Sequence, residues 1–259
     1  TILANKHIRL QCQSFLNDLN TNQHDDTFRW HFSEALADHA LGYMQLFKYV
    51  EGTVAGQQVE LSPWQAFLVA NAYGWVDKVD EGIRRYTRLI SLVGRKNAKS
   101  TVLALVGLYE LRFGPEGSQL VTMATQKEQA KLVWNMSGRM AETSDQRLIP
   151  SYNRTVSTIS NKDNWTRYWP LSKESKRLDG LNIRLAIIDE AAAIVDENLF
   201  DVVTSSMGSQ LSPQTWMITT GQTGAESNSF MKSLDYGKKV LDGLIDDQRV
   251  FTLAYALED

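Results

Sequence analysis

The chain has 259 residues, 43% of them hydrophobic, and a formal net charge of −3 at pH 7. This length allows one large domain or two small ones, and the charge excludes a global attraction to nucleic acid, so any DNA contact has to be local. The single cysteine, Cys12, excludes an intrachain disulfide framework and fits a reducing cytoplasm. No apolar run approaches the roughly 18 residues of a membrane span, so we expect no membrane association.

Two amphipathic segments come first in the chain. Residues 2–19 carry apolar side chains at helical spacing, and residues 33–47 repeat the pattern after a polar linker. We expect these two helices to form a small N-terminal helical or lid subdomain over residues 1–60. A core domain is then expected over residues 61–259.

A third helix is predicted from Ser62 and Pro63, which suit the N-cap and the first helical position. The amide of Gln65 could donate to and accept from an adenine edge, with a nearby apolar side chain packed on the ring. An ordinary capped helix with a core tryptophan, Trp64, explains the same residues. From this segment alone, the capped helix is the favoured interpretation.

The most informative stretch is residues 89–101. An apolar run, expected to be a buried strand, leads into a polar turn and then into a long apolar helix that extends to residue 113. Strand, turn with Lys-Ser, and helix are the context of a phosphate-binding loop, in which backbone N–H groups and a helix N-terminus bind an anion. The candidate residues are Gly94, Arg95, Lys96, Asn97, Ala98, Lys99, Ser100 and Thr101.

This loop departs from the usual G-x-x-x-x-G-K-[ST] pattern. Val93 and Ala98 stand where the two glycines belong. A basic loop that merely caps a helix is therefore the alternative. In the phosphate-loop interpretation, Lys99 reaches the β- and γ-phosphates and the hydroxyl of Ser100 ligates Mg²⁺.

Further strands and helices alternate after the loop, which predicts an α/β fold with a parallel sheet. We expect strands at residues 118–124, 155–159, 167–171, 185–188, 214–219 and 249–256, and helices at 125–144, 197–207 and 227–241.

Two carboxylates, Asp189 and Glu190, directly follow an apolar strand. Ligands bind at the carboxyl edge of open parallel sheets, so this pair and the Lys-Ser loop should face one site. There Asp189 would hold Mg²⁺ through water and Glu190 would polarise the attacking water. The alternative is an acid pair at a helix N-terminus.

The strand at residues 214–219 ends on Thr219 and Thr220, followed by Gly221. Hydroxyl groups at a strand tip beside the carboxylate pair could sense the γ-phosphate. The alternative is a turn that leaves the sheet.

Taken in order, these motifs resemble the ATPase domain of the large terminase subunit of tailed double-stranded DNA phages, in the branch that includes phages with HK97-type capsids. The resemblance covers nearly the whole chain. It rests on residues 8–10, 61–65, 84–86, 95–100, 124–125, 129–130, 178–182, 188–190 and 218–221.

The resemblance implies an ASCE-type P-loop NTPase that binds ATP and Mg²⁺. By resemblance, Trp64 and Gln65 contact adenine, Arg95 and Lys99 act on the phosphates, and Glu190 is catalytic. Ser100 and Asp189 are the implied metal ligands, and Thr219 and Thr220 the coupling motif. Ala98 remains a departure, which is tolerable if its φ is negative and unfavourable if its φ is positive.

The family also uses an arginine finger from a neighbouring subunit. Its usual position, directly before a glycine, is occupied here by Asp179. We therefore expect Arg177 to act as the finger, with Arg184 as the second candidate; a surface arginine is the alternative for either.

The resemblance further implies a motor that moves double-stranded DNA into a procapsid through a ring of about five subunits. Expected partners are the portal protein and the small terminase subunit, and the expected location is the host cytoplasm, docked on the procapsid. We expect no nuclease activity, because the family's C-terminal nuclease domain is absent from the sequence. The competing functions are another nucleic-acid ATPase, such as a helicase, and a non-hydrolysing scaffold that binds portal or DNA.

Overall fold

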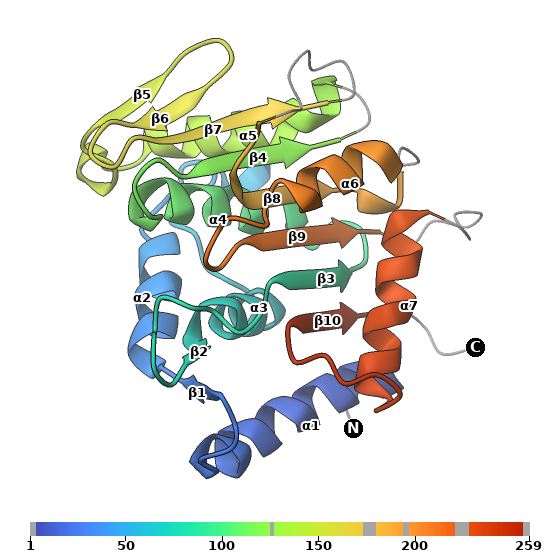
Figure 1. The fold of residues 1–259 in the computed structure, drawn as a ribbon. Coiled ribbons are helices and arrows are strands. Elements are labelled where there is room, and N and C mark those ends of the chain that lie inside the picture. Colours follow the sequence, from blue (N-terminus) through green and yellow to red (C-terminus); the bar gives the residue numbers. More distant parts are fainter. Residues whose placement is uncertain (1–3, 125–126, 173–179, 194–196, 221–227, 256–259) are drawn as a thin grey trace.

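The computed structural model describes residues 4–124, 127–172, 180–193, 197–220 and 228–255. Their centre is an eight-stranded sheet with the order β10-β3-β9-β8-β4-β7-β6-β5 (Figure 1). The strands are β3 (Arg88–Leu92), β4 (Gln119–Met123), β5 (Tyr152–Arg154), β6 (Ile159–Asn161), β7 (Thr166–Leu171), β8 (Ile183–Asp189), β9 (Gln214–Thr219) and β10 (Val250–Ala254).

Parallel pairing dominates this sheet. The strands from β10 to β7 are all parallel neighbours, and only β6 and β5 are added antiparallel at one edge. Strand β9 lies between β3, which leads into the Lys-Ser loop, and β8, which ends on Asp189. The predicted parallel-dominated α/β fold of the P-loop class is confirmed.

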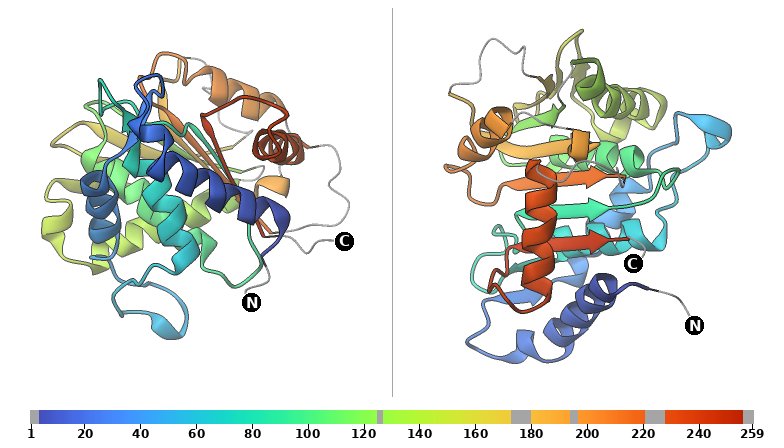
Figure 2. Two further views of the ribbon diagram at one scale, coloured as in Figure 1. Left: turned by 90° about the horizontal axis from the view of Figure 1, so that it is seen from below. Right: turned by 90° about the vertical axis from the view of Figure 1, so that its right-hand side faces the viewer.

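Helices cover both faces of the sheet (Figure 2). Helices α3 (Pro63–Gly74), α4 (Lys99–Phe113) and α5 (Lys127–Thr143) lie on one face, and α6 (Glu197–Ser205) and α7 (Ser229–Leu241) on the other. Successive strand residues point to opposite faces, so Leu89 joins the α3–α5 cluster while Ile90 joins the α6–α7 cluster. Both faces are apolar, which explains the nearly continuous apolar runs of the central strands.

The N-terminal helices pack onto this core. Helix α1 (Lys6–Asn20) contacts β10 and α7, and α2 (Glu34–Met44) contacts α3 and α4. A separate two-stranded ladder also connects this segment to the core. In it, β1 (Trp30–Phe32) pairs antiparallel with β2 (Trp75–Asp77), the strand that directly follows α3. Residues from before and after position 60 share one hydrophobic cluster, and the division into two domains stays a prediction.

One strand prediction was wrong, and one short ladder was missed. Residues 155–158 form a turn between β5 and β6, in which the Thr155 backbone N–H donates to the carbonyl of Thr158 at 2.8 Å. The Thr155 hydroxyl also accepts from the N–H of Thr158 at 3.1 Å, so its side chain stabilises the turn. The β1–β2 ladder was not predicted, because three-residue strands are too short to show alternation. In the described residues no helix is both long and apolar enough to cross a membrane.

Candidate functional site

The predicted site residues converge at the carboxyl edge of the sheet. Strand β3 delivers the loop at residues 94–98, β8 delivers Asp189 and Glu190, and β9 delivers Thr219 and Thr220. These strands are neighbours and parallel, so their carboxyl ends lie together. Segments about a hundred residues apart in sequence thereby form one site.

The loop at residues 94–98 is exposed and tightly turned. The Asn97 side chain donates to the carbonyl of Gly94 at 3.0 Å and to that of Arg95 at 3.2 Å. Lys96 and Ala98 have positive φ values of 63° and 51°. Ala98 therefore takes the conformation in which glycine is favoured, and its Cβ costs about 1–2 kcal/mol there.

Ser100 and Asp189 form the polar centre of the site. The hydroxyl of Ser100, in the first turn of α4, donates to Oδ2 of Asp189 at 2.6 Å. Burial raises the pKa of the Asp189 carboxyl, and the Ser100 hydrogen bond opposes this shift. Hydroxyl and carboxylate oxygens are ligands that Mg²⁺ prefers, so this pair fits a magnesium site. Thr101 follows, partly buried in the same helical turn.

Lys99 connects the loop to Glu190. The Lys99 side chain is buried, and its Nζ lies 3.9 Å from Oε1 of Glu190, whose side chain is 46% exposed. Lys99 therefore brings a buried positive charge to the N-terminus of α4, where an anion is favoured. The site thus pairs a cation suited to phosphate with oxygen ligands suited to Mg²⁺.

Glu190 is held in an unusual backbone conformation, with φ at 49°. Its Oε2 accepts hydrogen bonds from the hydroxyls of Thr219 at 3.2 Å and Thr220 at 3.1 Å, and from the Thr220 backbone N–H at 3.3 Å. The two threonines thus fix the carboxylate from the adjacent strand. A plain turn at the end of β9 does not require such contacts.

Gln65 has a second contact that the sequence did not predict. Its Oε1 accepts from the Ser62 N–H at 2.9 Å, as the capped helix requires, while its Nε2 donates to the carbonyl of Ala98 at 3.1 Å. Trp64 is partly buried against the core. The start of α3 is therefore tied to the loop at residues 94–98.

The prediction overlooked Asn228. Its side chain is buried, accepts from the Met231 N–H at 2.9 Å as the N-cap of α7, and donates to the carbonyl of Ala192. Ala192 N–H in turn approaches the Thr219 hydroxyl at 3.4 Å. Asn228 therefore supports the segment after Glu190; the sequence signals only its helix cap, because the contact with Ala192 is non-local.

The comparison with known families is decisive. Residues 63–239 match the family described as "Terminase large subunit, ATPase domain". The chain belongs to this family. Among curated proteins, no match was found.

Solved terminases have the same fold. The HK97 bacteriophage large terminase superposes with a TM-score of 0.69 at 22% identity, over 86% of this chain and 44% of that one. The ATPase domain of the Thermus phage P74-26 large terminase, as an R139A mutant, gives 0.51 at 16% identity, over 65% of this chain and 76% of that one. This terminase ATPase domain therefore corresponds to less than half the length of the HK97 protein.

The structure describes only one of the two arginine-finger candidates. Arg177 lies outside the described residues. Arg184 is the second residue of β8, at the opposite edge of the sheet from the Lys-Ser loop, and its side chain is only 5% exposed. Its Nε lies 3.6 Å from Oε2 of the buried Glu110, so within this domain it pairs with an internal carboxylate.

Proposed function

We propose that this domain is the ATP-hydrolysing motor of a viral DNA-packaging terminase, coupling Mg-ATP hydrolysis to movement of double-stranded DNA into a procapsid. The observation that carries the proposal is the convergence of Lys99, Ser100, Asp189 and Glu190 at one sheet edge. A non-hydrolysing scaffold has no physical need for all four.

The proposed chemistry assigns one role to each group. Ser100 and Asp189 would hold Mg²⁺, which neutralises phosphate charge when bound. Lys99 and the exposed Arg95 stabilise the negative charge that develops on the transferred phosphoryl group. Glu190 orients the attacking water and accepts its proton as the bond to the ADP oxygen breaks.

Nucleotide recognition and coupling involve two further pairs. Trp64 and Gln65 would contact adenine, since Gln65 already bonds to the phosphate loop through Ala98. Gly94, Lys96, Asn97 and Thr101 would contribute backbone and first-turn groups to the phosphates. Thr219 and Thr220 hold Glu190, so loss of the γ-phosphate could be relayed into β9.

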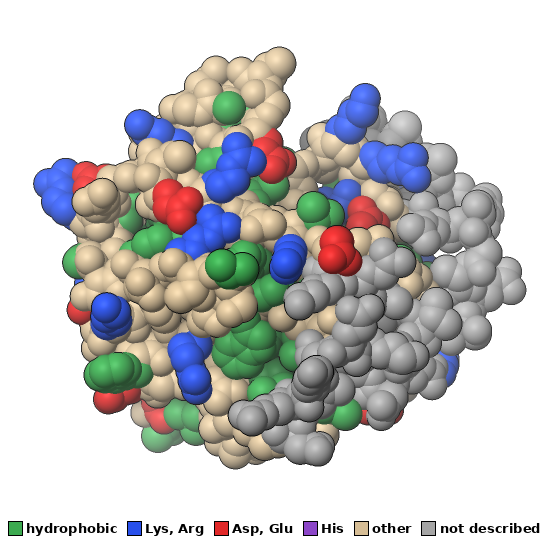
Figure 3. All heavy atoms as spheres, turned by 90° about the horizontal axis from the view of Figure 1, so that it is seen from above, with side chains coloured by type: hydrophobic (Ala, Val, Ile, Leu, Met, Phe, Trp, Pro, Cys, Tyr) green, Lys and Arg blue, Asp and Glu red, His purple; other side chains and the backbone are tan. Residues whose placement is uncertain are grey.

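Assembly and partners extend the proposal further. Arg177 would enter a neighbouring site in a ring of about five subunits. DNA, portal and small terminase subunit would bind in the host cytoplasm, on the procapsid. Figure 3 shows the face at the top of Figure 1, where basic and acidic side chains of the described residues are interspersed. A DNA contact on those residues would therefore have to be local.

The decisive experiment is steady-state ATP hydrolysis over a range of protein concentrations. We expect a specific rate that rises with concentration and that Glu190→Gln abolishes, while Glu116→Gln, an exposed carboxylate away from these contacts, leaves it unchanged. A constant specific rate would contradict the finger in trans. A rate no higher than that of Glu190→Gln, even with portal and DNA added, would favour the scaffold.

Absence of nuclease activity in this chain is a separate part of the proposal. It is tested by incubating the purified domain with supercoiled plasmid and Mg²⁺ or Mn²⁺. Nicking that co-purifies with the domain through successive columns would contradict it.

A further inference from the structure

A cavity of about 330 Å³ lies at the edge of the sheet opposite the phosphate loop. Arg84 and Arg184 line it, together with the aromatic side chains of Tyr73, Tyr109 and Phe113 and the ring of His39. The rings come from α2, α3 and α4, and Arg184 is the second residue of β8. The cavity therefore combines aromatic walls with two guanidinium groups.

The positive charges in this cavity exceed their carboxylate partners. The Arg84 and Arg184 side chains are 14% and 5% exposed, and both pair with Glu110, which is 1% exposed. Arg84 Nη1 contacts Glu110 Oε1 at 2.5 Å and Gln214 Oε1 at 3.1 Å. One buried carboxylate thus serves two buried guanidinium groups.

Arg184 is the incompletely paired member. Its Nε lies 3.6 Å from Glu110 Oε2, and neither atom has a hydrogen-bond partner among the described residues. Burial lowers the pKa of Arg184; the Glu110 carboxylate opposes this shift, and the nearby Arg84 adds to it. A buried cation without full compensation is costly, so an anion that entered the cavity would relieve this cost.

The buried hydroxyl of Tyr73 has no hydrogen-bond partner among the described residues, whereas two other polar groups of the cavity are engaged. Glu81 also lines it, but its side chain is 59% exposed and its Oε1 pairs with Nε2 of His31 at 3.2 Å. Nδ1 of His39 lies 3.0 Å from the Tyr109 hydroxyl. Neither group occupies the hydrogen-bonding position left at Arg184.

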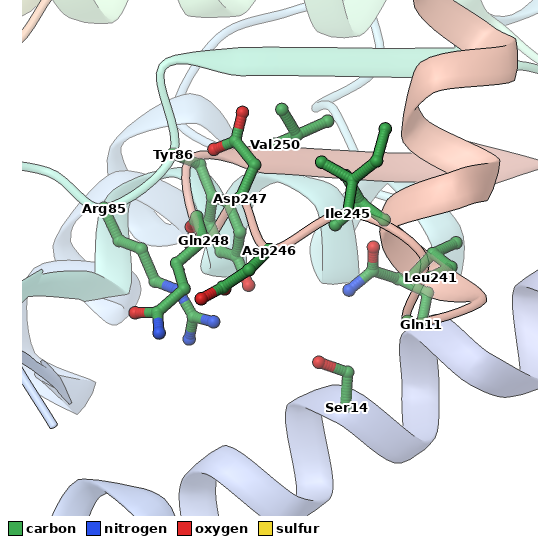
Figure 4. Close-up of a pocket in the computed structure, with 12 residues that line it drawn as sticks. Gln11, Ser14, Arg85, Tyr86, Leu241, Ile245, Asp246, Asp247, Gln248 and Val250 are labelled. Carbon is green, nitrogen blue, oxygen red and sulfur yellow. Dashed lines mark hydrogen bonds between the residues drawn. The ribbon is translucent and has the colours of Figure 1, made fainter.

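A second cavity, of about 280 Å³, shows the contrast (Figure 4). It is lined by Arg85, but this guanidinium has a carboxylate of its own at hydrogen-bond distance: Nη1 contacts Asp18 Oδ2 at 2.7 Å, and Nε donates to the Gln248 carbonyl at 3.1 Å. Asp246 and Asp247 add negative charge to that cavity. An anion is therefore favoured beside Arg184 and not beside Arg85.

We propose that the Arg84–Arg184 cavity binds a small organic carboxylate with a flat apolar body. The carboxylate lies against the two guanidinium groups, and the apolar body packs between the rings of Tyr73, Tyr109 and Phe113. The site is independent of the proposed ATPase chemistry, since it lies at the other end of α4 from Lys99.

Binding is tested by calorimetric titration of the whole domain with benzoate, acetate and benzamidine at fixed ionic strength. Benzoate should bind saturably at one site, about tenfold or more tightly than acetate, because its ring adds buried apolar area. Benzamidine has the shape of benzoate but the opposite charge, and it should not bind. Equal binding of benzoate and benzamidine, or no saturable binding of benzoate, would overturn the proposal.

Variants locate the site. Arg184→Met leaves Arg84 and Glu110 as a one-to-one pair, so it should fold and lose benzoate binding at least tenfold. Arg147→Met, at a 90% exposed side chain, and Lys99→Ala, at the phosphate loop, should leave benzoate binding unchanged. If Arg184→Met does not fold, Arg184→Lys keeps the charge and a crystal of its benzoate complex must place the carboxylate in this cavity. Benzoate elsewhere, or binding lost in Lys99→Ala, would refute the assignment.

Discussion

Glu190 and Thr220 are joined by two hydrogen bonds, because Oε2 of Glu190 accepts from both the hydroxyl and the backbone N–H of Thr220. Thr220→Val removes the hydroxyl and keeps the N–H and the branched shape. One lost hydrogen bond is worth about 1 kcal/mol, so we expect kcat for ATP to fall about fivefold to tenfold, with KM changed by less than about twofold.

The matched control for this variant is Thr215→Val. Thr215 lies on β9, and its hydroxyl contacts Met207 Sδ at 3.4 Å, away from Glu190. Its kcat should equal that of the wild type. Equal loss in both variants would mean that Thr220 acts through the strand and not through the Glu190 carboxylate.

Ala98→Gly should stabilise the domain. The αL conformation costs Ala98 about 1–2 kcal/mol, and glycine removes this cost. Glycine also gives the unfolded chain more conformational freedom, which lowers the stability gain by about 0.4–1 kcal/mol. We expect the free energy of unfolding in urea to rise by up to about 1.6 kcal/mol, and nucleotide binding to tighten as a methyl group leaves the phosphate loop.

Ala66→Gly is the control for this change, since Ala66 lies within α3 in ordinary helical conformation. There, glycine should lower the free energy of unfolding by about 1 kcal/mol. The opposite signs at the two positions are the test. If Ala98→Gly destabilises the domain as Ala66→Gly does, position 98 is not under backbone strain.

Asp189→Asn should separate stability from activity. Burial raises the folded-state pKa of Asp189, so its contribution to stability is fully present below the unfolded pKa, near 3.9, and is lost as pH rises through the folded pKa. At pH 7, without Mg²⁺ or nucleotide, Asn should therefore raise the free energy of unfolding. ATP hydrolysis should fall by about 100-fold or more, because the proposed metal ligand loses its charge.

Asp77→Asn provides the comparison of opposite sign. Hydrogen bonds from the Val79 backbone and from Arg29 lower the pKa of Asp77, so its stabilising effect is present at neutral pH and is lost in acid. Urea unfolding from pH 3 to pH 7 should show the two variants diverging in opposite directions from the wild type. A loss of stability at pH 7 in Asp189→Asn would contradict the desolvation argument.

The strands that build the site were predictable from local pattern. The runs ending at Leu92, Asp189 and Thr219 are apolar because β3, β8 and β9 are buried on both faces. Their parallel direction follows from the helices between them, and parallel strands end at one edge. The meeting of Lys99, Asp189 and Glu190 could therefore be expected without coordinates.

Non-local pairing and backbone torsion could not be predicted. The sequence left Arg184 open as an exposed arginine, because nothing near it in the chain indicates that Glu110 is its buried partner. Ala98 could be judged only once its φ was known. The bond from Gln65 to the Ala98 carbonyl likewise depends on how α3 packs beside α4, which sequence periodicity does not specify.

Asp18 and Arg85 offer a test of how firmly α1 belongs to the core. Both side chains are 6% exposed and 2.7 Å apart, and the guanidinium also lies over the rings of Trp75 and Tyr86. Asp18→Ala leaves this cation buried without its carboxylate, which should lower the free energy of unfolding by about 3 kcal/mol or more in urea denaturation.

The control for this variant is Asp26→Ala, at an exposed position, which should change the free energy of unfolding by less than about 0.5 kcal/mol. Asp18→Leu combined with Arg85→Met should recover much of the loss, because no charge is then stranded. Equal stability of the Asp18→Ala and Asp26→Ala variants would show that α1 contributes little to the folded core.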